Sequence, residues 1–179
     1  MSSTDPLAGL ADQVNTVARL TGTFTLRSGQ IATEYFDKYR FEAQPALLAQ
    51  IAEAMAPLIP AGTEVLAGLE MGGIPIATAL SLETGLPCVF VRKEAKEYGT
   101  CQFAEGLEIR GLKLCVIEDV VTTGGQVVLS AQDLRGAGAQ VEDVLCVIHR
   151  GSGVEPSLEA KGLNLKPLFT MADLKRHLG

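Results

Sequence analysis

Apolar and polar positions follow two different periods along the chain, and the changes between them mark the expected helices and strands. Residues 6–20 carry apolar residues at helical spacing, which predicts a helix. Residues 23–39 are rich in β-forming residues and are broken by Ser28-Gly29, which predicts a hairpin-like pair of strands. The run from Pro45 to Ile59 consists of helix-forming residues and ends among prolines, so a second helix is expected there.

From residue 63 onward, short apolar runs rich in β-branched residues alternate with helix-length segments. This alternation is typical of βαβ units and predicts an α/β fold with a central, mostly parallel sheet flanked by helices. The apolar runs lie within residues 63–70, 87–92, 113–119 and 141–150, and the helix-length segments lie within residues 73–85 and 124–139. Ligands of such sheets bind beyond the carboxyl ends of the strands. Polar residues stand at or just past these ends, namely Glu70, Arg92, Glu118, Asp119 and Arg150.

The composition is that of a globular protein, since 47% of the 179 residues are apolar and 20% are charged. We therefore expect a single domain over residues 1–179. The net charge is −6 and no long basic run occurs, which argues against nucleic acid as a partner. The N-terminus has no basic flank, no segment has the roughly 18 apolar residues of a membrane span, and the cysteines form no CxxC pair. These features predict a cytoplasmic protein that does not contact a membrane.

The most informative stretch is CVIEDVVTTGGQ, residues 115–126. We expect Leu114 to Ile117 to form a strand, residues 120–125 to turn the chain, and a helix to begin at Gln126. Gly124 and Gly125 allow the close backbone approach that a side chain would forbid, and Thr122 and Thr123 add hydroxyl donors. Because backbone N–H groups at a helix N-terminus attract anions, this turn is predicted to bind a monophosphate.

The adjacent acids Glu118 and Asp119 require a different ligand group, because like charges repel each other and a nearby phosphate adds to the repulsion. A ribose diol offers paired hydroxyl donors, which a carboxylate accepts, as in dinucleotide sites. The stretch is therefore predicted to hold a ribose 5-phosphate. A bare TTGG would more simply be an ordinary turn, but the joint pattern is more specific. Neither a GxxxxGK[ST] motif nor a complete GxGxxG motif occurs.

A second anion site is predicted after the strand at 87–92, where Arg92, Lys93 and Lys96 bring three cations into five residues. Fixed cations at a strand end stabilise the charge that grows on a departing diphosphate, although such runs are commonly just solvated. The irregular stretch from Lys93 to Gly111 is long for a compact domain and is expected to be functional or disordered. Gly72 and Gly73 let the backbone approach a ligand, or simply form a tight turn.

These segments resemble a known family. CVIEDVVTTGGQ resembles the 5-phosphoribosyl 1-diphosphate (PRPP) motif of the type I phosphoribosyltransferases. FTLRSGQ (24–30), MGGIPIATALS (71–81) and VRKEAKEYGT (91–100) resemble further segments of the orotate phosphoribosyltransferases, in the same order. The resemblance implies a type I phosphoribosyltransferase-like fold with a small hood, formed mainly by about residues 1–40 with C-terminal contributions. It also implies Mg²⁺-dependent transfer of ribose 5-phosphate from PRPP to N1 of orotate, giving orotidine 5′-monophosphate and diphosphate in pyrimidine biosynthesis.

The resemblance also implies roles for particular residues. Those implied in catalysis are Lys93, Lys96, Glu118 and Asp119. Those implied in PRPP binding are Gly72, Gly73, Arg92, Lys93, Lys96, Tyr98, Glu118, Asp119, Val120, Val121, Thr122, Thr123, Gly124, Gly125 and Gln126. Those implied in orotate binding are Arg27, Tyr35, Phe36, Thr122 and Arg150, the arginines because a guanidinium can bind a carboxylate with two hydrogen bonds. Mg²⁺ is expected to arrive with PRPP, without a protein metal cage.

In the family, Lys93 would serve its own subunit while Arg92 and Lys96 reach the neighbour's site, so a homodimer is expected. The sequence departs from the family at Tyr98, where many relatives have His, and at Gly72, where many have Lys. Two alternatives keep the PRPP site. One is a phosphoribosyltransferase for a purine or another base, and the other is a PRPP-sensing transcription regulator, against which the acidic charge balance weighs.

Overall fold

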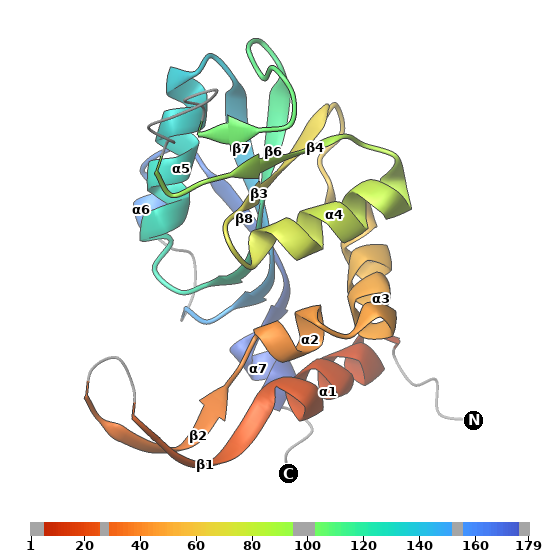
Figure 1. Ribbon diagram of the computed structural model, residues 1–179, viewed down its shortest axis with the longest axis vertical. Helices are drawn as coiled ribbons and strands as arrows, with labels where there is room; N and C mark the ends of the chain where they lie inside the picture. The colour runs from red at the N-terminus through yellow and green to blue at the C-terminus, as the bar shows by residue number, and fades with distance from the viewer. Residues whose placement is uncertain (1–5, 26–28, 95–102, 152–155, 176–179) are drawn as a thin grey trace.

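A central sheet organises the computed structural model, which describes residues 6–25, 29–94, 103–151 and 156–175. The sheet has six strands in the order β5-β4-β3-β6-β7-β8 (Figure 1), and all neighbouring pairs except β4 and β5 are parallel. Its strands are β3 (Val65–Leu69), β4 (Cys88–Val91), β5 (Ala104–Glu105), β6 (Lys113–Val121), β7 (Gln140–His149) and β8 (Asn164–Thr170). The predicted α/β class and mostly parallel sheet are confirmed.

Helices cover both faces of the sheet, as the all-apolar strands predict (Figure 1). They are α1 (Pro6–Ala18), α2 (Tyr39–Glu42), α3 (Pro45–Met55), η1 (Ala56–Leu58), α4 (Gly73–Thr84), α5 (Gly125–Gly136), α6 (Pro156–Glu159) and α7 (Met171–Lys175). Local sequence sets some of their ends. Pro45 occupies the first turn of α3, where its missing N–H costs nothing, and Gly85 ends α4 with a left-handed φ of 75°.

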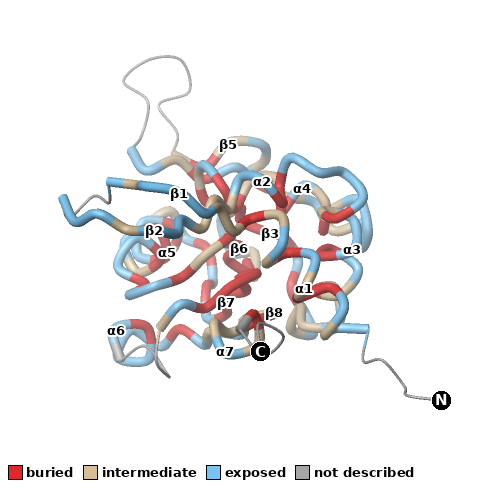
Figure 2. The backbone as a smooth tube through the Cα atoms, turned by 90° about the horizontal axis from the view of Figure 1, so that it is seen from below, coloured by how far each residue is buried: buried red, intermediate tan, exposed pale blue. Residues whose placement is uncertain are grey.

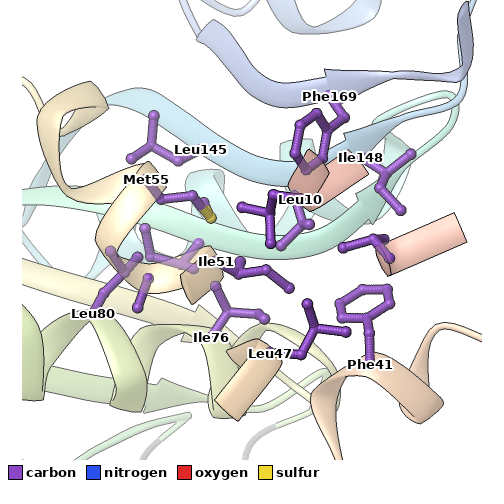
Figure 3. Close-up of a cluster of buried hydrophobic side chains, with 14 of the residues drawn as sticks. Leu10, Phe41, Leu47, Ile51, Met55, Ile76, Leu80, Leu145, Ile148 and Phe169 are labelled. Atoms are coloured by element: carbon purple, nitrogen blue, oxygen red, sulfur yellow. The ribbon is translucent and has the colours of Figure 1, made fainter. Parts of the chain in front are cut away.

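Two buried clusters form the core, one on each face of the sheet. The first packs α1, α3 and α4 against the sheet, and Figure 3 shows its large side chains, among them Phe41, Ile51 and Ile148. The second packs α5 against the opposite face. Alternation along β6 divides its residues between the clusters, since Ile117 belongs to the first and Val116 to the second. Strand β6 is thereby packed on both faces of the sheet.

The predicted hairpin forms a separate antiparallel ribbon of β1 (Arg19–Thr25) and β2 (Ile31–Phe36). The ribbon extends away from the sheet in Figure 1, and most of its residues are exposed (Figure 2). It leads through Asp37 into α2, which places the end of β2 near the carboxyl ends of the central strands. Among the described helices, none combines the length and the apolar character needed to cross a lipid bilayer.

Several predicted boundaries were wrong. The first helix ends at Ala18 rather than at residue 20, because residues 19–25 pair with β2. The helix from Pro45 ends at Met55 and continues as the 3-10 turn η1. The stretch 93–111 is not wholly irregular, since β5 pairs with β4 within it. The strand expected over 114–117 continues to Val121, because Val120 and Val121 extend the pairing with β7.

Candidate active site

The site lies where the direction of chain progression along the sheet changes. From β3 the chain passes through α4 to β4 on one side, and β6 lies on the other side of β3. Helix α4 packs on one face of the sheet while α5, which follows β6, packs on the other. Open α/β sheets bind ligands in the crevice at such a switch point. The turns after β3 and β6 border this crevice.

Glu118 and Asp119 lie inside β6 and not after it, because the strand ends at Val121, four residues later than expected. Because side chains alternate along a strand, the two carboxyl groups leave β6 in different directions. Both nevertheless reach the turn after β3. A Cβ atom on Gly72 would overlap Oδ2 of Asp119, and one on Gly73 would lie 3.1 Å from Oε2 of Glu118. Asp119 therefore requires glycine at position 72, whereas glycine at position 73 is required mainly by the Ile117 carbonyl oxygen, which a Cβ would overlap.

Asp119 is fully buried and pairs with Lys38, the residue that precedes α2. The Lys38 Nζ donates a hydrogen bond to Asp119 Oδ1 at 2.9 Å and lies 2.7 Å from Oδ2. Burial lowers the pKa of Lys38, but the hydrogen bond and negative charge of Asp119 outweigh burial and raise it overall. Lys38 is thus a stable cation beside the buried carboxylate.

Two further carboxyl groups share this environment. Glu42, the last residue of α2, is 8% exposed. Burial, followed by a hydrogen bond with Asp119, raises the pKa of Glu42 to about 9. Burial and the charge of Asp119 raise the pKa of Glu118 to about 8. Around neutral pH Glu42 and Glu118 therefore hold protons, and the Lys38 ammonium lies against the Asp119 carboxyl group.

The turn after β6 has the features of an anion site. Gly124 precedes α5 with a left-handed φ of 72°, and a Cβ there would lie 2.8 Å from the Leu158 side chain. Thr122 and Thr123 are exposed, and the Thr123 carbonyl accepts a hydrogen bond of 2.8 Å from Ser157 Oγ. Helix α5 begins at Gly125, one residue before the predicted start. Its first N–H groups have no acceptor within the helix, which leaves them able to bind an anion.

A cavity of about 370 Å³ adjoins the acids. It is lined by Glu34, Tyr35, Phe36, Asp37, Lys38, Tyr39, Val120, Thr122 and Arg150. Four of the five residues predicted for base binding therefore surround one space, and Arg27 lies outside the described residues. A second cavity of about 420 Å³ shares Glu34, Tyr35, Phe36 and Arg150 and adds Asn15, Arg19 and Met171.

Part of the predicted diphosphate site follows β4. The backbone N–H of Lys93 donates to Glu70 Oε1 at 2.7 Å, which ties the end of β4 to the end of β3. The positive charge of Lys93 acts on Glu118. Arg92 Nε forms an ion pair of 3.2 Å with Glu105 of β5. Lys96 and Tyr98 lie outside the described residues.

Lys38 and Glu42 are the site residues that sequence reasoning missed. Their spacing of four residues is a detectable signal, because residues i and i+4 of a helix face the same side. The surrounding run, DKYRFE (37–42), is too short to show a helical period and contains several charges, so it looks like solvated surface. Only the packing of α2 against β6 shows that both side chains reach Asp119.

Known proteins share both the sequence and this arrangement. The phosphoribosyl transferase domain family matches residues 39–166. An orotate phosphoribosyltransferase of Nocardioides sp. is 54% identical over 167 residues, which cover 93% of either chain. The crystal structure of Mycobacterium tuberculosis orotate phosphoribosyltransferase with Fe(III) dicitrate is 32% identical, has a TM-score of 0.85 and covers 95% of this chain and 99% of that one. A structure of the M. tuberculosis enzyme in complex with PRPP is 29% identical, with a TM-score of 0.80 and the same coverage. With its PRPP-type turn at the switch point of the sheet, the chain belongs to the phosphoribosyltransferase family, in the group of the orotate phosphoribosyltransferases.

Proposed function

We propose that the protein transfers ribose 5-phosphate from PRPP to N1 of orotate, giving orotidine 5′-monophosphate and diphosphate. One observation carries this proposal: the acids of β6, the turn leading into α5 and the cavity beside Arg150 meet at one edge of the sheet. Relatives named orotate phosphoribosyltransferase support orotate over a purine as the base. The reaction would supply pyrimidine nucleotide synthesis in the cytoplasm.

The sugar phosphate has a natural place in this geometry. We assign the 5-phosphate to the turn of residues 122–126, where exposed hydroxyl and N–H groups precede α5. Val120 and Val121 extend the strand and carry the turn at a fixed distance from the acids. Glu118 and Asp119 accept hydrogen bonds from the ribose hydroxyls, for which they must be ionised. PRPP binding is therefore expected to displace protons from the carboxyl cluster.

Catalysis requires no nucleophilic side chain. As the C1–O bond of PRPP breaks, positive charge grows on the ribosyl ring and negative charge grows on the diphosphate. We propose that Glu118 and Asp119 stabilise the positive charge on the ring. Lys93, with Lys96, Arg92 and Tyr98, would stabilise the negative charge on the diphosphate. The backbone at Gly72 and Gly73 borders the same leaving group. Arg92 is held by Glu105 in this chain and would have to leave that ion pair to serve a neighbouring subunit.

The base site follows from the cavity. Orotate is a flat ring with a carboxylate, and the exposed Arg150 can bind that carboxylate with two parallel hydrogen bonds. Tyr35 and Phe36 line the cavity with ring and backbone surface, and Thr122 joins the base site to the phosphate turn. Arg27 is proposed as a second cation for the base.

Mg²⁺ is proposed to enter the site on PRPP, since hard cations reach phosphate sites with few protein ligands. Among the described residues, no group of three His, Cys, Asp or Glu side chains is placed to hold a metal. Oε2 of Glu118 is buried without a hydrogen-bond partner, which leaves one carboxylate oxygen for the ion or a ribose hydroxyl. When bound, the ion neutralises charge on the diphosphate.

We also propose the quaternary arrangement of the family. Residues 1–40, with α7 packed against α1, would form a hood beside the base cavity, within a single domain of residues 1–179. A homodimer would share the residues that follow β4, with Lys93 serving its own subunit and Arg92 and Lys96 serving the neighbour.

The test is a base panel with a matched pair of variants. Protein, Mg²⁺ and PRPP are incubated separately with orotate, uracil, hypoxanthine, adenine and xanthine, and diphosphate release is followed. Orotate alone should be consumed. Asp119→Asn should reduce turnover by at least about 100-fold, since it removes a charge aimed at the transition state, whereas Asp133→Asn on the exposed side of α5 should not. Consumption of a purine alone would contradict the proposal, and so would PRPP-responsive DNA binding without turnover.

A further inference from the structure

The contact between Lys38 and Asp119 joins residues that are 81 positions apart in the chain. Asp119 is fully buried, and the Lys38 side chain is 32% exposed. The ammonium lies 2.9 Å from Oδ1 and 2.7 Å from Oδ2, so it engages both oxygens of the carboxylate. The backbone N–H of Val120 also donates to Oδ1. A carboxylate has about four lone-pair positions, so positions remain that can accept hydroxyl groups.

On its other side, Asp119 packs against the turn that contains Gly72. Gly72 is buried there, and any side chain at this position would overlap Oδ2 of Asp119. A cation can therefore not reach the carboxylate from residue 72. Among the described residues, the titratable groups that interact with this carboxylate are Lys38, Glu42, Glu118 on β6 and Cys146 on β7. Tyr39 acts on Lys38, and Lys93, after β4, acts on Glu118.

Lys38 also lines the 370 Å³ cavity together with Thr122 and Arg150. Its ammonium thus stands between the carboxylate proposed to hold the ribose and the space proposed to hold the base. The side chain comes from the start of α2, directly after the ribbon strand β2. A movement of the ribbon that shifts α2 would therefore change the contact between Lys38 and Asp119.

We propose that Lys38 is the positioning residue of Asp119, which it holds against the Gly72 turn in the orientation that receives the ribose hydroxyls of PRPP. This role rests on the proposed function. It gives the segment that leads into α2 a part in PRPP binding. It also explains how this chain supplies a cation next to Asp119, although residue 72 is a glycine. Lys38 acts on the ligand through Asp119, because its ammonium group contacts both carboxyl oxygens of that residue.

The experiment compares Lys38→Met, which keeps the length of the side chain, with Lys38→Arg, which keeps the charge. Lys161→Met, at an exposed position after α6, is the matched control. PRPP affinity in the presence of Mg²⁺ is measured by calorimetry from pH 6 to pH 9, and KM and kcat are measured for both substrates. Circular dichroism and thermal unfolding establish that each variant folds. Lys38→Gln replaces the methionine variant if the latter does not fold.

Loss of a charged hydrogen bond predicts that Lys38→Met weakens PRPP binding by about 10-fold or more. The KM for PRPP should rise more than the KM for orotate. The acidic limb of PRPP affinity should move to higher pH, because the cluster without its ammonium retains protons more firmly. Lys38→Arg should restore most of the affinity, and Lys161→Met should match the wild type.

Wild-type affinity and an unchanged pH profile in Lys38→Met would overturn the role of Lys38 alone. A uniform loss at every pH that Lys38→Arg does not rescue would also overturn it, since that result indicates a purely structural contribution. Failure of the wild-type protein to bind PRPP would instead overturn the proposed function, and the role of Lys38 with it.

Discussion

Substitution of Gly72 by alanine tests how tightly the turn after β3 is packed on the acid of β6. The backbone at Gly72 has φ −72° and ψ −28°, which alanine adopts without strain. The added Cβ would overlap Oδ2 of the fully buried Asp119. Any loss therefore reports the contact with Asp119 and not the backbone conformation.

The magnitude depends on which group gives way. If the turn moves, the cost is that of overpacking a buried site, about 1–3 kcal/mol. If Asp119 rotates away from Lys38, a buried ion pair is broken, which costs about 3–5 kcal/mol when both partners are enclosed. Lys38 is 32% exposed, so solvent screens the pair and the smaller range applies. We expect Gly72→Ala to lower the free energy of unfolding by about 1–3 kcal/mol.

Urea unfolding followed by circular dichroism measures this change, and calorimetry measures PRPP affinity in the same samples. Gly136→Ala is the control, because a Cβ at Gly136 in α5 meets no atom within 4 Å. That variant should be as stable as the wild type or slightly more stable. Wild-type stability and wild-type PRPP affinity in Gly72→Ala would refute the packing of Gly72 on Asp119.

Three further predictions follow from the site. Glu42→Gln should flatten the pH dependence of stability. Folding raises the pKa of Glu42 from 4.5 to about 9, so the stability that its protonated form contributes is present at low pH and is lost as the pH rises through that range. In urea unfolding at about pH 5 and pH 8, the free energy of unfolding should therefore fall less in the variant than in the wild type. Arg150→Lys should raise the KM for orotate by about 10-fold with little change in PRPP affinity, because a lysine cannot form the two parallel hydrogen bonds; equal effects on both substrates would place Arg150 elsewhere in the mechanism. Gly124→Ala should destabilise the protein by about 1–3 kcal/mol and weaken PRPP binding, because φ is 72° and the Cβ would meet Leu158 at 2.8 Å; thermal unfolding and calorimetry measure both effects.

The parts of the structure that the sequence predicts are those with a local signal. Apolar runs of β-branched residues locate the parallel strands, because burial on both faces leaves no polar positions in them. The glycines of TTGG locate the turn before α5, because one of them requires a left-handed φ. Polar strand ends locate the cavity, since the carboxyl ends of parallel strands meet at one edge of the sheet.

The remaining features depend on contacts between distant segments. Acidic residues rarely favour strands, so Glu118 and Asp119 resemble the end of one, but pairing with β7 carries the strand past them to Val121. Helix α2 is too short to show a period. Lys38, which precedes α2, meets Asp119 only after the chain has folded, and the packing of Asp119 on the turn after β3 gives a physical reason for glycine at position 72.

The shared wall between the two cavities has a practical consequence for inhibitor design. Arg150 borders both the 370 Å³ space and the 420 Å³ space. A flat acidic compound anchored on Arg150 could carry a substituent that continues into the second space and touches Asn15 and Met171. Neither of those residues is needed for turnover in the proposed function, so medicinal chemistry could use them to distinguish this enzyme from relatives with a different α1 or α7.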